Sequence, residues 1–192
     1  MLWYNGAGRS FGAAGRRAGQ EETQMPKLRK MLGAADWPSV TRMMRLIETQ
    51  NKRTLAGWAA DFAGRYLPLT AAEARPALTA ALDGCRRFAG GALPVKDLRP
   101  LVREAAAAAR AKASPVEEAA ARAVSVAAGV PQTPTNALGF LFYGAAAAAY
   151  SASDEPADWD ALAEAEFTAA YEALAALAVL DEPDPVKVNW NC

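Results

Sequence analysis

The chain of 192 residues holds 21 basic and 21 acidic side chains, no histidine and two cysteines, and about a quarter of it is alanine. The lack of histidine excludes Ser-His-Asp and Cys-His catalysis and the H-E-x-x-H zinc site, and Cys85 and Cys192 have no metal-ligand spacing. The charges are separated, because residues 1–112 hold 19 Lys/Arg against 9 Asp/Glu whereas residues 113–192 hold 2 against 12.

This composition predicts an all-α fold. Alanine is the best helix former, β-branched residues are scarce, and no stretch alternates apolar and polar residues. A hydrophobic content of 52% is enough for a core, and the length suits one domain. We therefore predict a single-domain antiparallel helical bundle, or stacked helical hairpins, with about seven helices and no bound metal or cofactor.

Three regions are expected along the chain. Residues 1–24 contain five glycines and no periodic pattern, which is typical of a flexible leader; Met25 offers an alternative start, in which case the leader is a misassigned start. A single helical domain is predicted over residues 25–185, followed by a C-terminal tail over residues 186–192. No stretch reaches the roughly 20 apolar residues of a membrane span, and the leader lacks the apolar block of a secretory signal.

The first helices carry one-sided apolar stripes. Pro38 favours a start near Trp37-Pro38, and a second helix follows until Leu67-Pro68. Asn51 is a good N-cap for a separate second helix, but continuity through residues 49–51 stays open.

Capping signals divide the middle of the chain. Thr70 with Glu73 has the form of a capping box before the third helix, which ends at Gly90-Gly91, and a fourth helix ends before Arg110. Ser114-Pro115-Val116-Glu117 combines an N-cap, proline at the first position and glutamate at the third, so a fifth helix is predicted from there to about Val130.

The last two predicted helices span Thr135 to about Ser151 and Asp158 to Leu180. In the last helix a stripe that includes Phe167, Leu174 and Leu177 predicts the buried face. The carboxylates of Glu164 and Glu166 are two residues apart, which suits a solvated surface and not a metal pair.

Two groups of residues are candidates for contact with a partner. The first comprises Asp158, Asp160 and Glu164, whose carboxylates are expected to face water and attract a basic protein, or else to pair with Arg42, Arg45 or Arg65. The second comprises Lys187, Asn189 and Trp190 of the tail. Trp190 either contacts a partner or folds back and fills a gap in the bundle.

No residue qualifies as catalytic, and nucleic acid is disfavoured as a partner. The basic residues are spread over four helices and are not gathered by a helix-turn-helix pattern. The patterns alone leave open a helical module that binds a small ligand or regulates another protein. They do not fix the oligomeric state.

Several segments resemble the Imm-5-like immunity proteins of bacterial toxin systems. The similarity is carried by Leu46-Ile47-Glu48-Thr49-Gln50, by Thr54 to Ala63 with its Trp-Ala-Ala-Asp block, by Leu67-Pro68, and by the ending Asp181-Glu182-Pro183-Asp184-Pro185 with Val188-Asn189-Trp190-Asn191-Cys192. It extends over about Pro26 to Cys192. The resemblance implies an all-helical, cytoplasmic, non-catalytic protein that binds a cognate toxin and neutralises it. Family members often carry histidines in the alanine-rich helices, whereas this chain has none.

Overall fold

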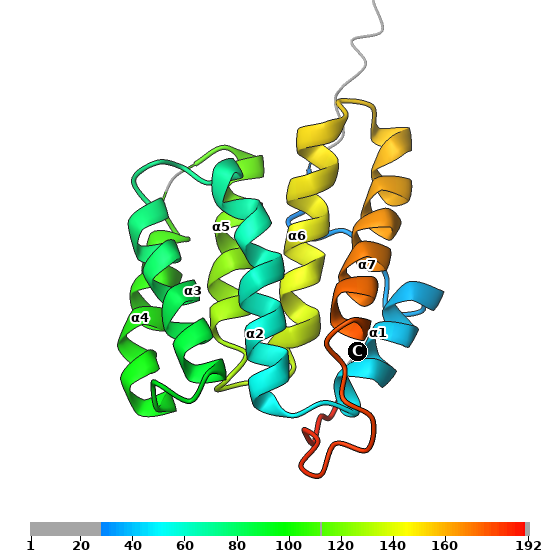
Figure 1. The fold of residues 1–192 in the computed structure, drawn as a ribbon. Coiled ribbons are helices and arrows are strands. Elements are labelled where there is room, and N and C mark those ends of the chain that lie inside the picture. The colour runs from blue at the N-terminus through cyan, green and yellow to red at the C-terminus, as the bar shows by residue number, and fades with distance from the viewer. Residues whose placement is uncertain (1–27, 112, 191–192) are drawn as a thin grey trace, which may run out of the picture.

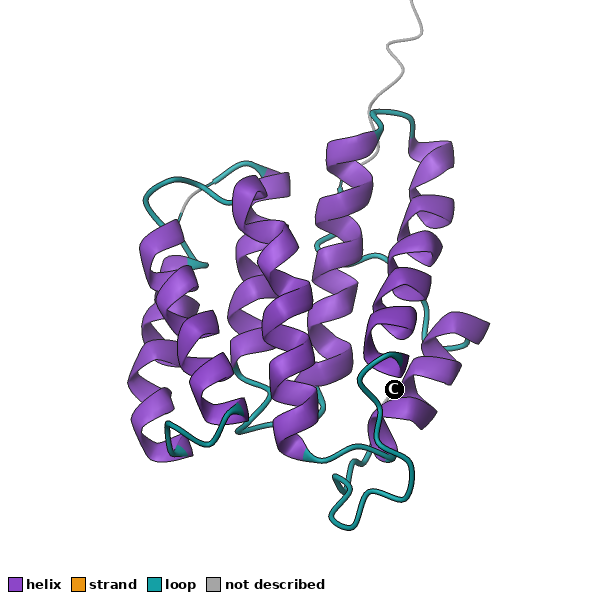
Figure 2. Ribbon diagram, viewed as in Figure 1, coloured by secondary structure: helices purple, strands orange, loops and turns teal. Residues whose placement is uncertain are grey.

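The computed structural model describes residues 28–111 and 113–190, which form seven α-helices and two short 3₁₀ helices, with no strand in these ranges (Figures 1 and 2). This confirms the predicted all-α fold; the predicted leader and Cys192 lie outside the described residues. The α-helices are α1 (Pro38–Glu48), α2 (Lys52–Ala63), α3 (Arg75–Ala89), α4 (Val95–Ala108), α5 (Pro115–Ala128), α6 (Asn136–Ala152) and α7 (Trp159–Ala175). The 3₁₀ helices are η1 (Gly64–Leu69) and η2 (Pro156–Asp158).

Local capping explains where α2 and α5 begin. The Asn51 side chain accepts hydrogen bonds from the backbone N–H groups of Arg53 and Thr54 at 2.8 and 2.9 Å, so α1 and α2 are separate helices. At α5 the predicted capping box is confirmed, since the Ser114 hydroxyl accepts from the Glu117 N–H while the Glu117 carboxylate accepts from the Ser114 N–H at 2.8 Å.

The predicted capping box of Thr70 and Glu73 is wrong. The Thr70 hydroxyl donates instead to the carbonyl of Leu67 at 2.7 Å, and α3 begins only at Arg75. Carbonyl groups at the end of η1 need donors, and the guanidinium of Arg75 also donates to the carbonyls of Leu67 and Thr70. These contacts hold residues 71–74 as a turn between η1 and α3.

The helices pack as neighbouring antiparallel pairs, with α5 against α2, α3, α4 and α6, and α7 against α6 and α1 (Figure 1). Alanine lets these helices approach closely, and in α6 the run Ala145–Ala147 is fully buried. Larger side chains fill the remaining space: the Trp58 and Phe140 rings lie 5.3 Å apart in an edge-to-face arrangement. The Trp58 indole N–H donates to the carbonyl of Ala170, which joins α2 to α7.

One polar cluster lies inside this core. Glu166 of α7 is 8% exposed, so its predicted place on a solvated surface is wrong. The Tyr66 hydroxyl donates to one of its carboxylate oxygens at 2.7 Å, and the Arg65 guanidinium lies 3.4 Å from the other. Burial, followed by the charge and hydrogen bond of Glu166, raises the pKa of Tyr66 well above its ordinary value, so Tyr66 stays a neutral donor. The Tyr66 ring fits against α6 at Gly144, where a Cβ atom would overlap it.

The last helix ends at Ala175, five residues before the predicted end at Leu180. The N–H groups of Leu177 and Ala178 bond to carbonyls three residues back, which tightens the final turn. The side-chain oxygen of Gln50 then accepts from the N–H of Val179 at 2.8 Å, and its side-chain NH2 group donates to the carbonyl of Val179 at 3.2 Å. These bonds replace the helical ones that would have continued α7.

Candidate partner-binding surface

The three predicted acids at the start of α7 are each engaged within the protein. Asp158 accepts a hydrogen bond from the Ser153 hydroxyl and Glu164 accepts one from the Ser39 hydroxyl, both at 2.8 Å. Asp160 lies 3.5 Å from Arg29 in an exposed ion pair. Such a pair contributes at most about 1 kcal/mol, so the Asp160 carboxylate remains available to a partner.

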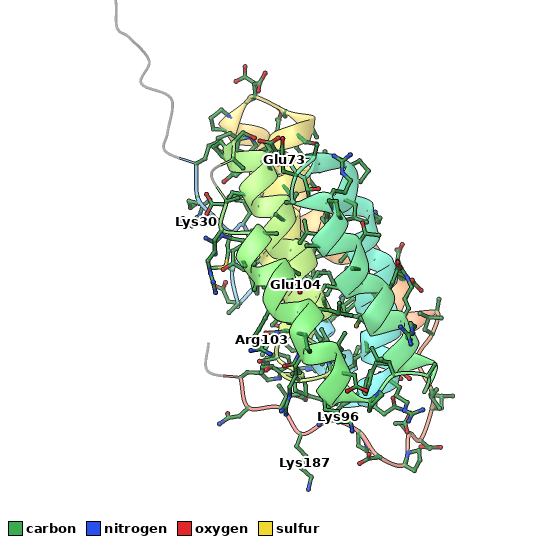
Figure 3. The ribbon with its side chains drawn as sticks, turned by 90° about the vertical axis from the view of Figure 1, so that its left-hand side faces the viewer. Lys30, Glu73, Lys96, Arg103, Glu104 and Lys187 are labelled. Carbon is green, nitrogen blue, oxygen red and sulfur yellow. The ribbon has the colours of Figure 1, made fainter. Side chains whose placement is uncertain are left out.

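The predicted tail residues lie beyond the opposite end of α7 (Figure 1). Lys187 and Asn189 are exposed, and Lys187 points away from the bundle in Figure 3. Trp190 folds back: it is half-buried against the core, and its indole N–H donates to the Glu48 carboxylate. The structure therefore does not bring the two predicted groups together.

A groove that was not predicted from the sequence separates α2 from α7. It has a volume of about 330 Å³ and an apolar lining with charged groups at one side. The lining residues are Trp58, Asp61, Phe62, Arg65, Ala169, Ala173 and Leu177. Arg65 covers the Phe62 ring, with its guanidinium carbon 4.6 Å from the ring centre, while Asp61 pairs with Arg86 at 2.7 Å.

Next to the groove the chain exposes an apolar turn, residues 177–180. Leu177, Val179 and Leu180 are 52%, 48% and 92% exposed, and Met31 is the other large apolar side chain exposed to this degree among the described residues. The prediction that Leu177 lies on the buried face of the last helix is wrong, because α7 ends before it. Contiguous exposed apolar residues with polar surroundings mark a protein-interaction site in many soluble proteins.

The sequence contains a signal for this turn. Residues 173–180 read ALAALAVL, a run without one polar side chain. A surface helix of that composition would have no face for water, which argues against a helix that continues to residue 180.

The charges of the described surface remain separated by face. Lys96 and Arg103 project from α4 on the side seen in Figure 3, together with Glu104. The acids that follow residue 153 lie in the loop before η2, on η2 and α7, and in the segment after α7. Among the described residues, the ion pairs Arg29–Asp160, Lys30–Glu118 and Arg65–Glu166 join the basic first part of the chain to the acidic second part.

Other kinds of site are not formed by the described part of the chain. Within residues 28–111 and 113–190 there is no grouping of three or more Cys, Asp or Glu side chains suited to a metal ion. In the same ranges none of the helices has the length and apolar character needed to cross a membrane.

Comparison with known proteins identifies the family. Residues 45–176 match the family described as Imm-5 like putative immunity protein, whereas no curated protein and no solved structure matches the chain. The match includes the groove-lining residues of α2 and the α7 residues up to 176, and it ends immediately before the apolar turn. Because the match covers more than half of the chain, this protein belongs to the Imm-5 like putative immunity protein family.

Proposed function

We propose that this protein neutralises a bacterial toxin by binding it, without catalysis, in the cytoplasm of the cell that carries both. Family membership supports the general role, since an immunity protein implies a toxin partner. The observation that carries the proposal further is the apolar turn 177–180 beside the α2–α7 groove.

The chemistry of this surface suits binding to a protein. Leu177 and Leu180 supply apolar area that the fold leaves exposed, and burying such a side chain against a partner contributes about 1.5–3 kcal/mol to binding. Arg65, half-exposed over Phe62, adds guanidinium donors at the edge of the groove. An apolar centre with charged groups around it is the usual composition of a protein interface.

A growth assay tests the proposal. A candidate toxin, sought among the genes beside this one, is expressed in a bacterial host with and without this protein, and the two proteins are co-purified. Neutralisation by binding predicts restored growth and a stoichiometric complex. The toxin should also be recovered with unchanged mass and active after dissociation, because an immunity protein that modified its toxin would leave a mass change.

Variants place the contact. Leu177→Asp with Leu180→Asp should abolish the complex and the protection, whereas Met31→Asp, which alters an equally apolar side chain on the segment before α1, should retain both. Absence of any complex between the wild-type protein and that toxin would overturn the proposal.

A further inference from the structure

The segment after α7 forms a closed loop, residues 179–186, whose two ends are attached to one buried residue. Gln50 is 1% exposed. Its side chain bonds to the N–H and carbonyl of Val179, and its backbone carbonyl accepts from the N–H of Val186 at 2.9 Å. Val186 is itself buried. The turn between α1 and α2 therefore fixes the start and the end of this loop, which we call the clamped loop.

Leu180, which directly follows the bonded Val179, has the most exposed large apolar side chain among the described residues, and we call this side chain the apolar tip. Leu180 is 92% exposed, and Asp181 after it has a φ of 55°. Non-glycine residues adopt this left-handed conformation uncommonly, and Pro183 and Pro185 limit the loop further. A leucine at this exposure contributes almost nothing to the hydrophobic core, so folding does not explain its presence.

Carboxylates follow this leucine in the sequence. Asp181, Glu182 and Asp184 follow within four residues, and none of them forms an ion pair within the described ranges. The Asn51 amide donates to Glu182 at 2.7 Å, which holds the side of the loop without neutralising its charge. Lys52 and Lys187 line a hollow beside Asp184 and not beside the tip. The clamped loop thus presents one exposed apolar side chain, Leu180, followed by three carboxylates.

We infer that the clamped loop enters the toxin as a preformed element, with Leu180 occupying an apolar pocket whose rim carries Lys and Arg side chains. The inference rests on the toxin-binding function proposed above and specifies the chemistry of the partner. Charge complementarity favours a basic rim, because the carboxylates at residues 181–184 would repel an acidic one. Since Gln50 already restricts the backbone, binding orders few additional residues, which favours slow dissociation.

Binding kinetics with the neighbouring toxin tests this inference. The wild-type protein is compared with three variants: Leu180→Asp for the tip, Asp181→Lys with Asp184→Lys for the charges, and Gln50→Leu for the clamp. Leu180→Asp should raise Kd about 100-fold or more at an unchanged melting temperature, as expected for a central anchor residue. The double lysine variant should slow association at least about tenfold and weaken its dependence on salt. Gln50→Leu should mainly speed dissociation, because Leu180 and the carboxylates are still present.

Matched controls separate this site from general effects of charge. Glu73→Lys with Glu104→Lys reverses two exposed acids near α3 and α4, both labelled in Figure 3, and should change Kd less than about twofold. Leu180→Met keeps an apolar tip and should bind like the wild type.

Other outcomes would overturn the inference in distinguishable ways. If the wild-type protein binds the toxin but the Leu180 and lysine variants bind equally well, the clamped loop is not the contact, and the proposed function stands. If Asp158→Lys with Asp160→Lys abolishes binding instead, the contact lies at the start of α7. Dissociation of a wild-type dimer by Leu180→Asp in the absence of toxin would assign the tip to a second copy of this chain. If the wild-type protein does not bind at all, the proposed function and the inference fail together.

Discussion

Replacing Gly144 by alanine should destabilise the protein through its contact with a tyrosine from another helix. A Cβ atom at this position would overlap the Tyr66 hydroxyl oxygen and the ring carbon that bears it. Tyr66 is 2% exposed and cannot move outward without losing its bond to the buried Glu166 carboxylate. The substitution therefore forces either an overlap or the loss of that bond.

The magnitude follows from three opposing contributions. Alanine favours a helix interior over glycine by about 1 kcal/mol. Overpacking a core costs about 1–3 kcal/mol, and breaking a hydrogen bond to a charged group costs about 1.5–3 kcal/mol. The overlap alone gives a net loss of no more than about 2 kcal/mol, and the overlap together with the lost bond gives about 1.5–5 kcal/mol, which for a chain of this size lowers Tm by about 3–20 °C.

Gly139 provides the matched control on the same helix. A Cβ atom there would meet Val126 at 3.8 Å, which is an ordinary contact, so Gly139→Ala should be neutral or raise the stability by up to about 1 kcal/mol. Thermal and urea unfolding of the two variants would measure the difference. If Gly144→Ala unfolds at the same temperature as Gly139→Ala, the Tyr66 ring does not pack against α6 as described.

Three further predictions concern single side chains. The backbone N–H of Ser114, and then its hydroxyl, bond to Glu117 and lower the pKa of that carboxyl below its ordinary 4.5. This stabilisation is complete above that value and is lost as pH falls through the lower folded pKa, so Glu117→Gln should lose less Tm than the wild type between about pH 6 and pH 3. An equal loss of Tm would contradict the capping box. Burial, opposed by the charge of Arg86, raises the pKa of the Cys85 thiol to about 12. In a Cys192→Ser variant, Ellman's reagent near pH 8 should therefore detect no thiol in the native protein and one thiol after denaturation. Rapid reaction of the native protein would show that Cys85 is accessible. Arg86 joins α3 to α2 through Asp61 at 2.7 Å and the carbonyl of Ala60 at 3.1 Å. Arg86→Ala should therefore lower the free energy of unfolding by about 1–2 kcal/mol in urea titrations. An unchanged urea midpoint would show that these half-exposed bonds contribute nothing to stability.

Features that depend on neighbouring residues were predictable from the sequence. Pro38, Asn51 and Ser114 each mark the start of a helix because their effect acts within one turn of backbone. The predictions failed where a distant residue intervenes. The carboxylate of Glu166 bonds to Tyr66, which lies 100 positions earlier in the sequence. The helix α7 ends early because Gln50, 129 positions before Val179, binds the backbone of Val179.

The candidate surface was predictable only in part. The acids and the tail residues were chosen by their charge and by the exposed character of a chain end, and the structure leaves Lys187, Asn189 and Asp160 accessible. The apolar stripe of the last predicted helix includes Leu177, and that helix is predicted to end at Leu180, so the sequence predicts a helical position for both residues. A periodic pattern does not specify where the backbone hydrogen bonds stop, so the exposure of these residues required the tertiary structure.

The attachment of the clamped loop to Gln50 also bears on how partner specificity can change. The family match ends at residue 176, so the clamped loop lies outside the matched range. Because both ends of the loop are fixed by a residue of the α1–α2 turn, residues 180–185 can be exchanged with little effect on the helices. On the inference that this loop contacts the toxin, exchanging residues 180–185 for those of a relative should change the choice of toxin and leave the melting temperature nearly unchanged.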